Sequence, residues 1–221
     1  PPGKLSLGSK VEQAEEACNK YLGTDTSTFV TNATAGFEIA YKYANLKAGD
    51  EVIVPAITFV ATMAYPLSIG CKLVFADVDP RTINMDPADV ARKITPKTKM
   101  LILCSPSNPT GSVYTQEELK ELADVLAKYP QVFVVADEIY EHINYISKHQ
   151  SIAQFPEIRD RVIIVNGVSK AYAMTGWRIG YVLGPSEVIT AMTKLQENVA
   201  ACAPLPSQYA AIEALSGKED Y

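Results

Sequence analysis

Short apolar runs, separated by segments with helical spacing, recur along this chain of 221 residues. Most of the runs lack the polar–apolar alternation of a strand with one solvent-exposed face. They lie at residues 28–31, 51–55, 73–76, 100–104, 132–136, 162–165 and 178–183. Strands of this kind are typical of parallel sheets that helices cover on both faces. The sequence therefore predicts an α/β fold, with a three-layer, doubly wound and mainly parallel sheet.

The segments between these strands have the periodicity of amphipathic helices. We expect helices near residues 10–21, 37–44, 56–69, 87–94, 115–128, 186–199 and 204–215. Thr115 and Glu118 form the pattern of a capping box at the start of one of them. No repeat, low-complexity tract or long linker interrupts the chain, so we expect a single domain over residues 1–221.

Charge and hydropathy exclude several classes of partner. A net charge of −5 gives no basic surface, so nucleic acid and anionic membranes are not expected as partners. No apolar run approaches the roughly 20 residues that span a bilayer, and the first residues lack the apolar core of a signal peptide. Four scattered cysteines indicate reduced thiols of a cytoplasmic protein. There are only two histidines, and His149 is expected to be solvated, so we expect no metal site.

Polar and aromatic side chains follow five of the predicted strands. They are Asn32, Phe59, Asn108, Asp137 and Lys170. In doubly wound sheets, ligands bind beyond the carboxyl ends of the strands. We therefore expect these side chains to converge on one crevice.

Lys170 has neighbours that suit a cofactor carrying an aldehyde and a phosphate. Its amine could condense with the aldehyde, while the Ser169 hydroxyl and the Arg178 guanidinium hold the phosphate. The alternative is a surface lysine in a loop and an arginine at a helix end. The spacing of these three residues does not by itself decide between the two.

A second phosphate contact is expected at Thr34 and Ala35, where a strand turns through small residues into a helix. A helix start offers free backbone N–H groups and a positive dipole end, and Thr34 adds a hydroxyl. An ordinary helix cap is the alternative, and the segment taken alone favours the cap.

Three spaced motifs give the chain a family resemblance. They are SPSNPTG (105–111), DEIY (137–140) and SKAYAMTGWRIG (169–180). In this order they resemble the class I/II aminotransferases of fold type I, which use pyridoxal 5'-phosphate. The resemblance implies transfer of an amino group between an amino-acid donor and a 2-oxo acid acceptor. It also implies a homodimer.

The resemblance assigns roles to the matching residues. Lys170 is the catalytic lysine that forms the internal aldimine, and Asp137 keeps the ring nitrogen protonated. Tyr140 and Asn108 hydrogen-bond the ring oxygen, whereas Arg178, with Ser169, holds the phosphate. An alternative to one of these roles stays open. Taken alone, the Asp137 carboxylate of DEIY would also fit the first turn of an ordinary helix.

The first hundred residues resemble a different family. TNATAG (31–36), GDEVIVPAITFVAT (49–62) and FADVDPRTINMDP (75–87) are similar to the DegT/DnrJ/EryC1/StrS sugar aminotransferases. This likeness implies that Thr34 and Ala35 hold the phosphate and that Phe59 stacks on the ring, although Phe59 fits an ordinary core aromatic nearly as well. The chain is therefore expected to be a chimera, DegT-like over residues 1–99 and class I/II-like over residues 100–221. One uninterrupted natural relative across residue 99 would contradict this hypothesis.

Other functions remain open. Class I/II enzymes continue into a C-terminal small domain whose arginine binds the substrate carboxylate, and nothing in the sequence matches that arginine. One alternative is therefore a domain that binds the cofactor with little or no turnover. Lyase, decarboxylase or racemase chemistry on the same cofactor is another. A nicotinamide-binding Rossmann fold is not expected, because no GxGxxG follows the first strand.

Overall fold

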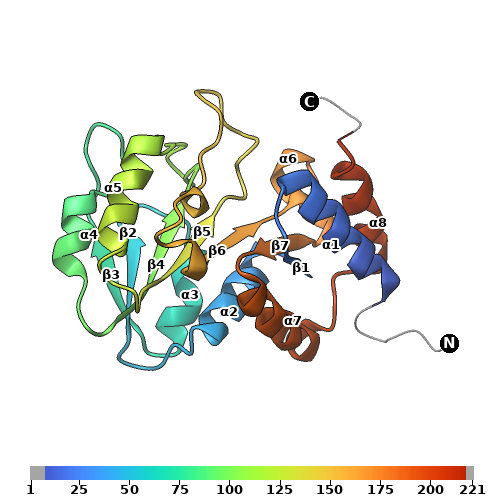
Figure 1. The fold of residues 1–221 in the computed structure, drawn as a ribbon, viewed down its shortest axis with the longest axis horizontal. Coiled ribbons are helices and arrows are strands. Elements are labelled where there is room, and N and C mark those ends of the chain that lie inside the picture. The colour runs from blue at the N-terminus through green and yellow to red at the C-terminus, as the bar shows by residue number, and fades with distance from the viewer. Residues whose placement is uncertain (1–7, 218–221) are drawn as a thin grey trace.

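The computed structural model describes residues 8–217, which form a seven-stranded sheet with helices packed against it (Figure 1). The strand order is β1-β7-β6-β5-β4-β2-β3. The strands are β1 (Ser27–Val30), β2 (Glu51–Pro55), β3 (Lys72–Ala76), β4 (Thr98–Cys104), β5 (Phe133–Asp137), β6 (Val162–Asn166) and β7 (Gly180–Leu183). Strands β2 to β6 pair in parallel, whereas β7 runs antiparallel to both β1 and β6. The predicted α/β fold with a mainly parallel sheet is confirmed.

Helices lie on both faces of the sheet, as expected for three layers. They are α1 (Ser9–Leu22), α2 (Ala33–Tyr43), α3 (Ala61–Ser68), α4 (Pro87–Lys93), α5 (Gln116–Leu126), α6 (Val168–Ala171), α7 (Ser186–Ala200) and α8 (Leu205–Ala214). On one face, side chains of α2 and α7 share a hydrophobic core with the sheet. The opposite face packs against α4 and α5 over the β4–β5 region, and against α1 and α8 over β1 and β7. Among the described residues, we find no helix with the length and apolar character that crossing a bilayer requires.

Strand β4 illustrates why the predicted strands are apolar at every position. Met100 and Ile102 point into the α2/α7 core, whereas Leu101 and Leu103 point into the α4/α5 core. Successive strand residues face opposite sides, and here both sides are buried. The capping box that begins α5 is also confirmed, because the Thr115 side chain accepts from Glu118 N and the Glu118 side chain accepts from Thr115 N.

Two segments differ from the sequence-based expectation. Residues 56–60 lie outside the helix that we expected over 56–69, because α3 begins only at Ala61. The Thr62 hydroxyl donates to Phe59 O at 2.7 Å in the turn that precedes α3. The loop that was expected around Lys170 contains the four-residue helix α6.

Candidate active site

The carboxyl ends of β4, β5 and β6 lie side by side, in register up to the last residues of β4 and β5. Cys104 pairs with Asp137, and Asp137 pairs with Val165. Backbone hydrogen bonds continue past the strand ends, since Ser105 N donates to Asp137 O and Glu138 N donates to Val165 O, each at 3.0 Å. The segments that carry Asn108, Tyr140 and Lys170 therefore leave the sheet at the same edge.

Three of the expected site residues meet directly at this edge. The Asn108 side-chain amide donates to the Tyr140 hydroxyl at 3.2 Å. The Lys170 Nζ lies 5.6 Å from the centre of the Tyr140 ring, within reach of a cation–π interaction. A hollow of about 310 Å³ adjoins this group and is lined in part by Asn108 and Tyr140.

Asp137 is the buried acid of the group, with 7% of its surface exposed. Its Oδ1 accepts from Ile139 N at 3.3 Å. Burial raises the pKa of the Asp137 carboxyl to about 7, and the positive charge of Lys170 opposes this rise. Within the described residues, no lysine, arginine or histidine forms an ion pair with Asp137. Such a carboxyl is suited to receive a cation such as a protonated ring nitrogen.

The start of α2 lies against the segment that precedes Lys170. A Cβ on Gly180 would lie 3.3 Å from Ala33 N and 3.1 Å from Asn166 O, and a Cβ on Gly167 would lie 2.9 Å from the Gly180 Cα. Larger residues at the two glycines would therefore force these backbones apart. The close approach brings the start of α2 to the edge that carries Lys170.

The Thr34–Ala35 segment is an ordinary helix cap in this structure. The Asn32 side chain accepts from Ala35 N at 3.0 Å, so this N–H is already engaged. The N–H groups of Ala33 and Thr34 lie in the first turn and have no acceptor within the helix. Thr34 is exposed. These two N–H groups and the Thr34 hydroxyl are the donors that the start of α2 offers.

The remaining expected residues lie nearby but are less engaged. Ser169 and Lys170 are half-buried in α6. Arg178 is exposed, adopts a left-handed backbone conformation with φ of 56°, and donates from Nη1 to Thr175 O at 2.7 Å. Phe59 lies in the loop between β2 and α3 with half of its surface exposed, and no aromatic contact joins its ring to another described residue.

These residues fit pyridoxal phosphate on chemical grounds. A primary amine, a buried carboxyl without a cationic partner, and an amide next to a phenol match an aldehyde, a ring nitrogen and a ring oxygen. Free N–H groups at a helix start suit a phosphate.

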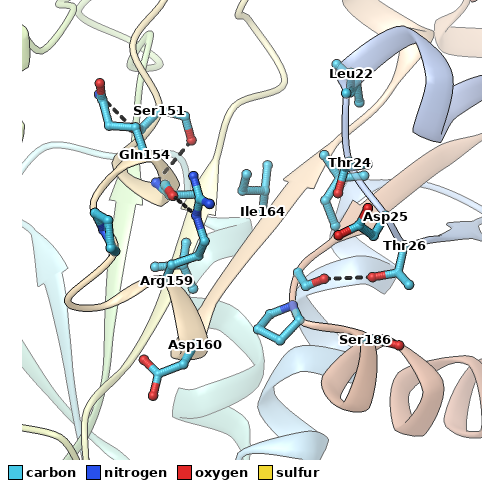
Figure 2. A pocket seen from close by; sticks show the side chains of 17 residues that line it. Leu22, Thr24, Asp25, Thr26, Ser151, Gln154, Arg159, Asp160, Ile164 and Ser186 are labelled. Atoms are coloured by element: carbon cyan, nitrogen blue, oxygen red, sulfur yellow. Dashed lines mark hydrogen bonds between the residues drawn. The ribbon is translucent and has the colours of Figure 1, made fainter.

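A larger cavity of about 720 Å³ lies at the other end of β6 (Figure 2). It is bordered by the first residue of β6, Val162, and by the end of β7, with Ile164 between its two walls. Gln154 and Arg159 lie on one side, and Thr24 and Asp25 on the other. Lys170 follows the opposite end of β6, so this cavity is not part of the group described above.

Sequence reasoning missed two features next to the site. Cys104 was expected to be a buried thiol, but its place beside Asp137, at the end of β4, was not expected. The prediction of a solvated His149 is wrong, because only 14% of its side chain is exposed and its ring lies 3.1 Å from Glu138. The polar surroundings of His149 in the sequence gave no sign of this burial, which depends on contact with the end of β5.

A single family model, that of the aminotransferases of class I and II, matches residues 5–221. The chain belongs to this family. Class I/II aminotransferases use pyridoxal phosphate, in agreement with the chemistry of the residues at the sheet edge.

Curated relatives from several organisms match this chain. A probable aspartate/prephenate aminotransferase of Rhizobium leguminosarum bv. phaseoli is 43% identical over 196 residues, covering 85% of this chain and 48% of the relative. A bifunctional aspartate aminotransferase and glutamate/aspartate-prephenate aminotransferase of Petunia hybrida is 39% identical over 218 residues, or 96% of this chain and 45% of the relative. The chain therefore spans about half the length of the curated relatives it matches.

Solved aminotransferase structures share the fold. An aspartate aminotransferase from Rhizobium meliloti superposes with a TM-score of 0.89 at 34% identity, covering 99% of this chain and 56% of that one. An aromatic aminotransferase from Pyrococcus horikoshii gives a TM-score of 0.86 at 34% identity, with 93% of this chain and 58% of that one covered.

The comparisons give no support to the expected chimera. The class I/II model and the Petunia relative both match on each side of residue 99. A natural relative that runs across residue 99 without a break contradicts a crossover at that position. The local likeness of residues 31–36, 49–62 and 75–87 to sugar aminotransferases is therefore too weak to assign them to a second family.

Proposed function

We propose that this chain carries the cofactor site of a pyridoxal-phosphate-dependent aminotransferase that moves an amino group between an amino acid and a 2-oxo acid. One observation carries the proposal: Asn108, Tyr140, Asp137 and Lys170 leave three adjacent strand ends and gather at one edge of the sheet. Membership of the class I/II family supports the same activity.

The proposed catalytic residues are Lys170, Asp137 and Tyr140. When bound, pyridoxal phosphate supplies a ring that withdraws electrons from the substrate carbon. Lys170 attaches the cofactor through its amine and then carries the proton that leaves and rejoins the substrate. Asp137 holds a proton on the ring nitrogen, and Tyr140 with Asn108 holds the ring oxygen.

The proposed phosphate contacts are Thr34, Ala35, Ser169 and Arg178. Thr34 offers a hydroxyl and a free N–H, whereas the Ala35 N–H must first leave the Asn32 side chain. Arg178 is exposed and donates from Nη1 to Thr175 O, and its guanidinium is proposed to bind the phosphate. Phe59, in the loop before α3, is proposed to cover one face of the ring, and half of its surface is exposed.

Aspartate is the amino donor that we propose first, since several similar proteins are named aspartate/prephenate aminotransferases. These names also favour transamination over lyase, decarboxylase or racemase chemistry. A domain that binds the cofactor with little turnover remains the alternative. The expected single domain over residues 1–221 is proposed to be one continuous class I/II segment.

We further propose that the chain forms a homodimer in the cytoplasm. Apolar side chains in and around α3 are exposed, including Val60 at 62% and Leu67 at 61%, and a second copy could bury them. None of the four cysteines forms a disulfide, which suits a reducing compartment.

Isotope transfer tests the activity. The chain, loaded with pyridoxal phosphate, is incubated with [15N]aspartate and 2-oxoglutarate, and [15N]glutamate is measured by mass spectrometry. We expect labelled glutamate from the native chain and none from Lys170→Ala. Bound cofactor without labelled glutamate would support the alternative of a binding domain, whereas labelled alanine or racemised aspartate would indicate another reaction.

A further inference from the structure

Glu138, Glu141 and His149 form a cluster next to the proposed cofactor site. One carboxylate oxygen from each glutamate and one ring nitrogen of His149 lie within 4.8 Å of one another. Glu138 directly follows β5, whereas His149 returns from the far end of the loop that leaves this strand. From the sequence no metal site is expected, because the chain has only two histidines and His149 is expected to be solvated.

A hydrogen bond fixes the orientation of the Glu138 carboxylate, as is usual for carboxylates that bind metal ions. Only 6% of its side chain is exposed, and its Oε1 accepts from the Ser151 hydroxyl at 2.6 Å. Hydrogen bonds of this kind fix the direction of a ligating carboxylate. The second oxygen, Oε2, faces the His149 ring.

Both ring nitrogens of His149 are inaccessible to solvent. Nε2 lies 3.1 Å from Glu138 Oε2, the distance of an ion pair with a protonated ring. Nδ1 has no hydrogen-bond partner among the described residues. Buried polar atoms normally have a partner, and an unpaired one requires an explanation.

Glu141 supplies the third group, with 13% of its side chain exposed. Its Oε1 is inaccessible and has no hydrogen bond, although His142 Nε2 lies 3.1 Å away. Glu138, Glu141 and His149 thus place two carboxylates and an imidazole together with several unsatisfied buried atoms.

We propose that Glu138, Glu141 and His149 bind a zinc ion. Zinc accepts nitrogen and oxygen ligands at about 2.0–2.2 Å in a tetrahedron, so adjacent ligands lie about 3.3 Å apart. The 3.1 Å between His149 Nε2 and Glu138 Oε2 is close to such a ligand edge. An imidazole in the set favours zinc over magnesium or calcium, which prefer oxygen ligands alone.

The ion ties the loop after β5 to the strand end. Glu138 adjoins Asp137, and Glu141 adjoins Tyr140, so the ion lies one residue away from two of the proposed cofactor contacts. The zinc ion touches neither the cofactor nor the substrate in this account. Its role is to hold the positions of the two neighbouring side chains.

Zinc binding is measured by equilibrium dialysis of the full chain, both with and without pyridoxal phosphate. We expect one zinc ion per chain in both states, so the result does not depend on the proposed function. His149→Gln and Glu141→Gln are expected to weaken binding by about 100-fold or more. Glu117→Gln is the matched control for Glu141→Gln, because Glu117 is an exposed glutamate on α5, and its affinity is expected to stay within about three-fold of the native chain.

Any of three results would overturn the proposal: no zinc bound at one ion per chain, unchanged binding in His149→Gln, or an equal loss of affinity in Glu117→Gln. X-ray absorption of zinc in the native chain decides the case if the variants do not fold. One imidazole nitrogen and carboxylate oxygens at about 2.0–2.2 Å would support the site. Two imidazoles or oxygen ligands alone would contradict it.

Discussion

The Asn108 side-chain amide donates to the Tyr140 hydroxyl at 3.2 Å, which joins the loop after β4 to the turn after β5. The residues are 32 positions apart in the sequence, and the parallel pairing of the two strands brings them together. The Lys170 Nζ lies 5.6 Å from the centre of the Tyr140 ring, so this pair adjoins the proposed catalytic lysine.

Tyr140→Phe tests this pair. The change removes one hydroxyl that we assign to the ring oxygen while keeping the ring near Lys170. A hydrogen bond to a charged group contributes about 1.5–3 kcal/mol, so we expect the cofactor to bind about 10-fold or more weakly, as measured by equilibrium dialysis. Tyr145→Phe is the matched control, because Tyr145 is 93% exposed, and it should leave cofactor affinity unchanged. Equal affinities of the two variants would contradict the assignment of Tyr140.

Asp137→Asn tests the proposed ring-nitrogen partner. The amide keeps the size of the side chain but carries no negative charge to hold a proton on the ring nitrogen. We expect amino transfer to fall about 100-fold or more, with attachment of the cofactor to Lys170 retained. The control is Asp160→Asn, because the Asp160 side chain is 78% exposed. A variant at Asp137 that transfers the amino group at the native rate would remove this residue from the mechanism.

Gly167→Ala tests the close approach between the segment before Lys170 and the start of β7. The added Cβ would lie 2.9 Å from the Gly180 Cα, so the backbones must separate. Overpacking of this kind typically costs about 1–3 kcal/mol, which denaturant unfolding would measure, and we also expect weaker cofactor binding. Gly176→Ala is the control, because a Cβ there meets nothing within 4 Å. A stability loss of the same size in both variants would mean that the close approach does not matter.

Glu15 lies outside the site, on α1, and we expect it to make the stability of the fold depend on pH. Burial raises the pKa of its carboxyl from 4.5 to about 7 in the folded chain. The folded state therefore holds the proton more tightly than the unfolded state. The stability from this group is fully present below pH 4.5 and is lost as pH rises through about 7.

Glu15→Gln removes this loss of stability. We expect the variant to exceed the native free energy of unfolding by about 1–3 kcal/mol at pH 8, and to match it within error at pH 4. Glu16→Gln is the control, because Glu16 is the adjacent exposed carboxylate on α1. If the difference between Glu15→Gln and the native chain is the same at both pH values, the buried-carboxyl explanation is wrong.

Most of the fold could be predicted, because buried parallel strands and amphipathic helices have strong local patterns. The continuous apolar run of β4 and the Thr115 capping box are examples. The antiparallel direction of β7 could not be read from its own residues, which are buried in either direction. The connection between β6 and β7 nevertheless carries a signal for an antiparallel pair. Its helix α6 has only four residues, too short for the crossover helix that usually joins two parallel strands.

The candidate site was predicted in part for the same reason. Residues at the carboxyl ends of parallel strands, such as Asp137, are placed by the sheet itself. The Arg178 guanidinium and the Phe59 ring depend on loop conformations that no local pattern determines. The burial of His149 depends on contact with Glu138, eleven residues earlier, and not on its neighbours in sequence.

Covalent labelling of Lys170 tests the central claim most directly. The chain is incubated with pyridoxal phosphate, reduced with borohydride, digested, and mapped by peptide mass spectrometry. The account predicts one modified peptide, with the reduced cofactor on Lys170. Label on a different lysine, or no label at all, would contradict it.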